Sequence, residues 1–221
     1  MSNPSNPSSP ANLGALYAAA RVRVTELVAN VDDTLPVPAT PGWTVHDVVA
    51  HIRGIVEDGL AGNMDGAPGE QWTAAQVARG AAKTTAELLS EWTEQAPTFE
   101  QFLSSPDGAM VGNAVVDVHT HEADLRHALG LAAIAPPEFL DWVMQRFDPG
   151  FTEAVAAAGL APVTVRATPF EWFRGRLGRR TEAEVGAYDW SGDPAPYLDI
   201  WFVFGRRTES LGESESVSGA Q

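Results

Sequence analysis

The hydrophobic positions in the first part of the chain recur every three or four residues, which is the period of an amphipathic helix. In the first stripe these positions are Leu13, Leu16, Tyr17, Ala20, Val24, Leu27, Val28 and Val31. Stripes of this kind predict helices over residues 12–33, 45–60, 73–95 and 113–129. A fifth helix is predicted from Pro136, with a kink at Pro149 and Gly150.

Polar and glycine positions mark where these helices begin and end. Thr44 with Asp47, and Thr73 with Gln76, have the spacing of the capping box that opens a helix. Residues 35–41 carry three prolines and predict a connector, and residues 62–69 are rich in glycine. Residues 97–106 predict a break before the helix at 113–129, which ends at Gly130.

After residue 162 the pattern changes. Residues 163–167 alternate with period two and predict a strand, residues 170–177 and 181–188 predict short helices, and residues 200–204 predict a second strand or a buried run. The predicted fold class is therefore mainly α, with a four-helix bundle over residues 12–159 and a small α+β C-terminal appendage over residues 160–205. The polar segments 1–11 and 206–221 are expected to be disordered tails.

Composition excludes several classes of function. A formal net charge of −15 disfavours binding to nucleic acid or anionic membranes, because both require clustered Lys and Arg. No apolar run approaches the roughly 20 residues that a membrane span needs, and the first ten residues do not resemble a secretory signal. We therefore expect a cytoplasmic protein. The chain has no cysteine, so any thiol must come from another molecule.

Two histidines and one aspartate form a candidate metal site. Asp117 and His121 are four residues apart, which places both side chains on one face of the 113–129 helix. His51 follows Val48 on the apolar side of the second helix and is a candidate third ligand, since bundle cores often hold metals between facing helices. The alternative is a hydrogen-bonded Asp–His pair on a solvated helix face.

The other histidines are expected to have different roles. His119 points roughly 160° away from His121 on an ideal helix. His127 shares no turn with the Asp117–His121 pair. We expect both to be surface or capping residues, and His46, in the first turn after Thr44, to be structural.

Two segments resemble one known family. Residues 42–51 (GWTVHDVVAH) and 117–125 (DVHTHEADL), together with Gly130, resemble the mycothiol-dependent maleylpyruvate isomerase family of the DinB-like superfamily. The resemblance covers most of residues 12–205, with a looser match at residues 178–180 and 192–194. It implies a DinB-like four-helix bundle with a divalent metal, generally zinc, held by His51, Asp117 and His121, and mycothiol as a cofactor. Many members have Glu where this chain has the shorter Asp117.

The resemblance implies a metal-dependent enzyme with two small-molecule partners, a thiol and an electrophilic substrate. The reaction is S-transfer to the substrate or its isomerisation. The alternative is a non-catalytic binding or sensor module, and the chain is expected to be a monomer or a homodimer.

Three further residues are candidates for the site. Asp124 is expected either to accept from the other N–H of the His121 ring, or to be a solvated helix residue or a carboxylate paired with Arg126 or another arginine. Arg179 or Arg180 either binds a substrate carboxylate or lies on the surface in a turn.

Overall fold

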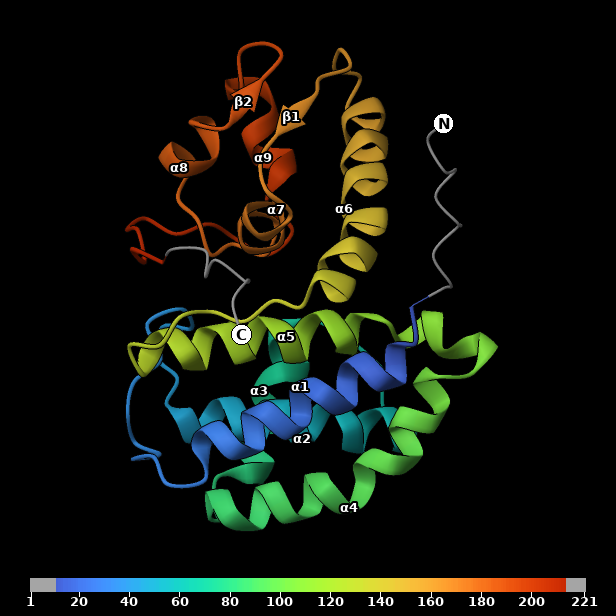
Figure 1. The fold of residues 1–221 in the computed structure, drawn as a ribbon, viewed down its shortest axis with the longest axis vertical. Coiled ribbons are helices and arrows are strands. Elements are labelled where there is room, and N and C mark those ends of the chain that lie inside the picture. The colour runs from blue at the N-terminus through green and yellow to red at the C-terminus, as the bar shows by residue number, and fades with distance from the viewer. Residues whose placement is uncertain (1–10, 214–221) are drawn as a thin grey trace, which may run out of the picture. The chain divides into compact units, whose positions relative to one another are not determined.

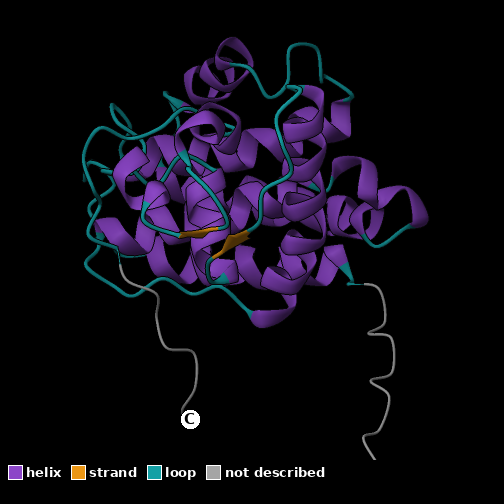
Figure 2. Cartoon of the chain, turned by 90° about the horizontal axis from the view of Figure 1, so that it is seen from above, coloured by secondary structure: helices purple, strands orange, loops and turns teal. Residues whose placement is uncertain are grey.

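The computed structural model describes residues 11–213, which divide into two compact units on either side of the Leu129–Gly130 bond. Figure 1 shows the order of the elements, and Figure 2 shows that helices account for nearly all of the regular structure. In the described part, no helix combines the length and the apolar composition that crossing a membrane requires. The mainly α fold predicted from the sequence is confirmed.

Four helices form the bundle of the first unit: α1 (Leu13–Val28), α2 (Val45–Ala61), α4 (Thr85–Leu103) and α5 (Asn113–Ala128). Helix α1 packs on α4 and α5, and α2 packs on the same two helices, so the four close into a ring. The shorter α3 (Glu70–Gly80) lies outside this ring against α2. A 3₁₀ helix, η1 (Pro106–Val111), connects α4 to α5.

The start of α2 follows the predicted capping box. The Asp47 amide donates to Thr44 Oγ1 at 3.3 Å, and Asp47 Oδ2 accepts from the Thr44 amide at 2.9 Å. These two bonds satisfy N–H groups that have no partner within the helix. The helix ends at Gly62, whose φ of 71° is a left-handed conformation that glycine adopts without strain.

The single helix predicted over residues 73–95 is wrong. The structure has two helices, α3 and α4, with a turn at residues 81–84 between them. Thr73 and Gln76 do not form a cap, because α3 begins at Glu70 and the Gln76 side chain is fully buried. A second capping box, Thr84 with Glu87, opens α4 instead. Helix α4 also continues through Pro97 to Leu103, so the break begins several residues later than predicted.

The second unit comprises the elements from α6 (Pro137–Ala157) onward: β1 (Val165–Arg166), α7 (Pro169–Arg176), α8 (Glu182–Gly186), β2 (Asp189–Trp190), the 3₁₀ helix η2 (Ala195–Tyr197) and α9 (Leu198–Trp201). The two short strands pair antiparallel, with Val165 opposite Trp190 and Arg166 opposite Asp189. The sequence pattern assigns α6 to the bundle, whereas the contacts in the structure group it with the C-terminal elements. Helix α6 is also continuous through Pro149 and Gly150.

An aromatic cluster forms the core of the second unit. Trp201 is fully buried and lies 5.2 Å from Phe151 and 4.4 Å from Trp172, measured between ring centroids. Of the two alternatives for residues 200–204, the strand is wrong: this apolar run starts with the end of α9 and, as a buried run, contributes Trp201 to the core. The actual partner of β1 is β2, at Asp189–Trp190.

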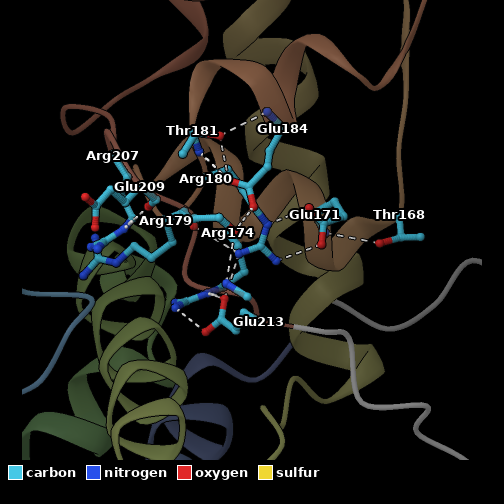
Figure 3. A network of polar contacts seen from close by, with 12 residues as sticks. Thr168, Glu171, Arg174, Arg179, Arg180, Thr181, Glu184, Arg207, Glu209 and Glu213 are labelled. Atoms are coloured by element: carbon cyan, nitrogen blue, oxygen red, sulfur yellow. Dashed lines mark hydrogen bonds and ion pairs between the residues drawn. The ribbon is translucent and has the colours of Figure 1, made fainter.

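A network of ion pairs holds the C-terminal segment of the second unit (Figure 3). Both oxygens of the Glu213 carboxylate accept from the Arg174 guanidinium, at 2.7 and 2.8 Å, and one of them also accepts from Arg180 at 2.8 Å. Arg180 in addition makes two 2.8 Å bonds to Glu171. Residues 206–213 thus differ from the disordered segment that composition predicts, whereas residues 1–10 and 214–221 lie outside the described part.

Candidate metal centre

The three predicted ligands come together between α2 and α5. His51 Nε2 lies 3.4 Å from Asp117 Oδ2, and His121 Nε2 lies 3.6 Å from Asp117 Oδ1. One potential ligand atom from each of the three residues lies within 4.8 Å of the other two. The two imidazoles are nearly perpendicular, with ring centroids 5.1 Å apart, and the Nε2 atom of each lies near the same carboxylate.

These separations suit a shared divalent ion. Ligand atoms at about 2.1 Å from a tetrahedral ion lie about 3.4 Å apart, which agrees with both N···O distances. Both distances exceed the 2.7–3.2 Å, roughly, of an ordinary N–H···O hydrogen bond. Two neutral imidazoles and one carboxylate are also a donor set that zinc commonly takes. The shorter Asp117 side chain therefore reaches both histidines without any further shift of the helices.

The three side chains of this cluster differ in burial. The side chains of His51 and His121 are 6% and 7% exposed, whereas that of Asp117 is 29% exposed. Trp43, in the loop before α2, covers the histidines: its ring stacks on His121 at 6.1 Å and lies 5.2 Å from His51. The sequence analysis did not single out Trp43 as a site residue, because only the fold brings this loop beside α5.

Each histidine has a polar side chain beside its other ring nitrogen. His121 Nδ1 lies 3.1 Å from Oδ2 of Asp124, whose side chain is fully buried. The structure thus places Asp124 beside His121, one turn along α5, and not on a solvated face. His51 Nδ1 lies 2.7 Å from Gln76 Oε1, and Gln76 is also fully buried. The sequence analysis missed Gln76 as a site residue, since it assigned this side chain to a helix cap.

A carboxylate completes the contacts on the His51 side. Gln76 Nε2 donates to Asp58 Oδ2 at 2.8 Å, and Asp58 Oδ1 accepts from Arg79 at 2.7 Å and from Asn63 at 3.0 Å. Burial alone would raise the pKa of Asp58, but the hydrogen bonds from Arg79, Gln76 and Asn63 hold it below its usual value. Asp58 is therefore ionised at neutral pH.

The predicted substrate arginines lie in the second unit. Arg180 is buried and bonded to Glu171 and Glu213, so its guanidinium is engaged within the fold. Arg179 is half-buried, and its Nη1 donates to the Leu177 carbonyl at 2.7 Å.

Of the three remaining histidines, one lies in a different environment from the one predicted. His46 Nε2 lies 2.8 Å from the Lys83 carbonyl, in keeping with a structural role, and His127 is half-buried in the last turn of α5. The predicted surface position of His119 is wrong, because this residue is fully buried and its Nδ1–H donates to the Val115 carbonyl at 2.8 Å. Helix α5 packs on both α1 and α2, so more than one of its faces is covered.

The burial of His119 predicts acid sensitivity. Burial lowers the pKa of His119 from 6.5 to about 3. The unfolded chain therefore takes up a proton below pH 6.5 that the folded chain does not, and stability falls as the pH decreases, by about 1.4 kcal/mol per pH unit for this one group.

Urea unfolding of the wild type and of His119→Gln at pH 7.5, 6 and 5 measures this effect. Between pH 7.5 and pH 5, the free energy of unfolding should fall by about 2 kcal/mol less in the variant than in the wild type. Equal pH dependence in the two proteins would show that His119 does not contribute.

Together, the bundle and the cluster define the class: a four-helix protein with a metal-type ligand set on two packed helices. Comparison with protein families agrees, because residues 17–126 match the model of the mycothiol maleylpyruvate isomerase N-terminal domain. Through this domain the chain belongs to that family. The match contains His51, Asp117 and His121, and it ends before the second unit begins. Searches of curated proteins and of solved structures returned no match.

Proposed function

We propose that the protein is a metal-dependent enzyme that uses a low-molecular-weight thiol, of the mycothiol type named in the family's description, to act on a small electrophilic substrate. The observation that carries this proposal is the convergence of His51, Asp117 and His121 on one point, with separations suited to one divalent ion. Three protein ligands leave a coordination position open, as in catalytic zinc sites.

The residues around the site have complementary tasks in this proposal. His51 and His121 present Nε2 to the ion, while Gln76 hydrogen-bonds the opposite nitrogen of His51 and Asp124 lies 3.1 Å from the opposite nitrogen of His121. Trp43 packs against both rings and limits access of water on that side. Bound at this position, a divalent ion supplies the positive charge that keeps a thiol deprotonated at neutral pH.

The thiol itself must come from outside, because the chain contains no cysteine. Addition of the S–H group across an activated carbon–carbon double bond breaks the π bond, forms a C–S bond at one carbon and a C–H bond at the other, and gives an S-conjugate. If the thiol and the proton are eliminated again after rotation about that carbon–carbon bond, the double bond re-forms and the product is an isomer of the substrate. The proposed location is the cytoplasm, where small thiols stay reduced.

The pH dependence of turnover tests this function. With zinc-loaded protein and saturating mycothiol, a screen of small unsaturated acids should find one that is consumed only when thiol, metal and protein are all present. The rate at saturating thiol should rise with pH through an apparent pKa well below the roughly 8.5 of a free thiol.

A pH profile centred on the pKa of the free thiol would contradict metal activation. If the protein binds metal and ligand but consumes no electrophile in any condition, the binding or sensor module becomes the better description.

A further inference from the structure

A buried chain of hydrogen bonds leads from His51 away from the metal centre. It runs from His51 Nδ1 to Gln76 Oε1 at 2.7 Å, and from Gln76 Nε2 to Asp58 Oδ2 at 2.8 Å. The three residues are 4%, 0% and 2% exposed, respectively, so water does not compete for these bonds. Asp58 is anchored in turn by Arg79 and Asn63.

The chemistry of Asp58 fixes the direction of every bond in this chain. An ionised carboxylate only accepts hydrogen bonds, so Gln76 must turn its NH₂ group towards Asp58. The amide oxygen of Gln76 then faces His51, and the His51 Nδ1 must carry the ring proton in order to donate to it. In the neutral ring Nε2 then has no proton, and this is the atom that lies 3.4 Å from Asp117.

We propose that Asp58 and Gln76 are positioning residues that hold His51 in the tautomer whose Nε2 lone pair faces the metal centre. Neutral imidazole in water populates both tautomers, and a metal ligand needs the one with an unprotonated nitrogen at the site. This chain of hydrogen bonds from Asp58 through Gln76 to His51, called the relay below, selects that tautomer before the ion binds and fixes the plane of the His51 ring. The importance of this tautomer for metal binding rests on the proposed function. The prediction of the tautomer does not, because it follows from the hydrogen bonds alone.

The packing of α3 supports this role. Helix α3 lies outside the bundle ring, and it approaches α2 closely enough to place Gln76 beside His51. The approach depends on Gly54, one turn after His51, because a Cβ there would lie 2.6 Å from Gln76 Cβ. A glycine inside a helix is otherwise unfavourable. A similar contact occurs at Gly80, where a Cβ would lie 2.5 Å from the Ala50 methyl group.

The variant Asp58→Asn should reverse the donor and acceptor roles along the relay without changing its geometry, because asparagine has the same shape as aspartate. The oxygen of the introduced amide should keep the two bonds from Arg79 and Asn63, which leaves the NH₂ group of that amide facing Gln76. Gln76 must then turn its own oxygen towards this NH₂ group and its own NH₂ group towards His51. His51 Nδ1 becomes an acceptor, so the proton moves to Nε2 and blocks the ligand atom.

The double variant Asp58→Asn, Gln76→Glu restores the original direction. A carboxylate at position 76 accepts both from the amide introduced at position 58 and from His51 Nδ1–H, and the buried charge is the same as in the wild type. Glu57→Gln is the matched control: Glu57 also pairs with Arg79, at 3.1 Å, but makes no contact with Gln76. It removes one negative charge from the adjacent position on α2.

Two-bond ¹H–¹⁵N correlation spectra of the metal-free proteins read the tautomer of His51. We expect the Nδ1–H form in the wild type, the control and the double variant, and the Nε2–H form in Asp58→Asn. Zinc affinity, measured by competition with a chelator, should fall about 10–100-fold in Asp58→Asn and recover in the double variant.

Two results would overturn the proposal: the Nε2–H tautomer in the wild type, or an unchanged tautomer in folded Asp58→Asn. The wild-type spectrum is decisive by itself, so the test does not depend on the variant folding. Failure of the proposed function is distinguishable, because a tautomer that switches as expected in a protein without zinc affinity or thiol chemistry supports the relay and contradicts only the function. A switch that leaves zinc affinity unchanged contradicts the link between the two.

Discussion

His51→Ala and His121→Ala should each lose the bound divalent ion while keeping the helical fold. Each substitution removes one of three ligand atoms, so the loss of affinity should exceed the roughly 10–100-fold that removal of an outer partner costs. Thiol-dependent turnover should disappear with the metal. The fold should persist because the bundle core consists of other side chains, among them Tyr17, Leu88 and Trp92.

The measurement is metal content after equilibrium dialysis against zinc, with circular dichroism as the check on folding. His127→Ala is the control, because His127 lies on the same helix as His121 but outside the ligand cluster. It should bind metal as the wild type does. Near-stoichiometric zinc in both His51→Ala and His121→Ala would show that the cluster is not the metal site.

Glu213→Gln should destabilise the second unit by about 3–5 kcal/mol, the usual cost of breaking a buried ion pair by removing one partner. The Glu213 side chain is only 4% exposed and accepts two hydrogen bonds from Arg174, which is fully buried. Glutamine cannot accept at both positions, so the variant replaces the two charge-assisted hydrogen bonds from Arg174 by fewer and weaker ones in the interior.

Urea unfolding of the full-length protein measures this loss. Glu153→Gln, an exposed change on α6 in the same unit, should remain within about 0.5 kcal/mol of the wild type. Equal stability of the two variants would show that Glu213 does not secure the C-terminal segment. The composition of residues 206–221 by itself predicts a dispensable tail, whereas we expect Glu213→Gln to lower the stability.

Local patterns predicted the parts of the fold that depend on neighbouring residues. The Thr44–Asp47 capping box and the i, i+4 relation of Asp117 and His121 are properties of one helix each, so spacing alone is informative. The turn between α3 and α4 was missed because the apolar stripe continues across it. The segment around Trp201 was left open between a strand and a buried run because a short apolar run has no period that separates a strand from a buried helix.

Long-range packing determined what the sequence did not reveal. His119 was expected on the surface because it lies opposite His121, but α5 is covered on that face as well: the neighbouring Glu122 is fully buried and paired with Arg23 of α1 at 2.7 Å. Gln76 becomes a partner of His51 only because α3 packs closely against Gly54. Neither relation leaves a signal in residue spacing.

The cobalt form of the protein provides the most direct test of the central claim, that the three-ligand site binds an external thiol. Cobalt takes the same ligands as zinc and makes changes in coordination visible in the absorption spectrum. Titration with mycothiol should produce a sulfur-to-metal charge-transfer band that saturates at one thiol per metal. A cobalt spectrum that stays unchanged at saturating thiol, in protein that demonstrably holds the metal, would contradict the account.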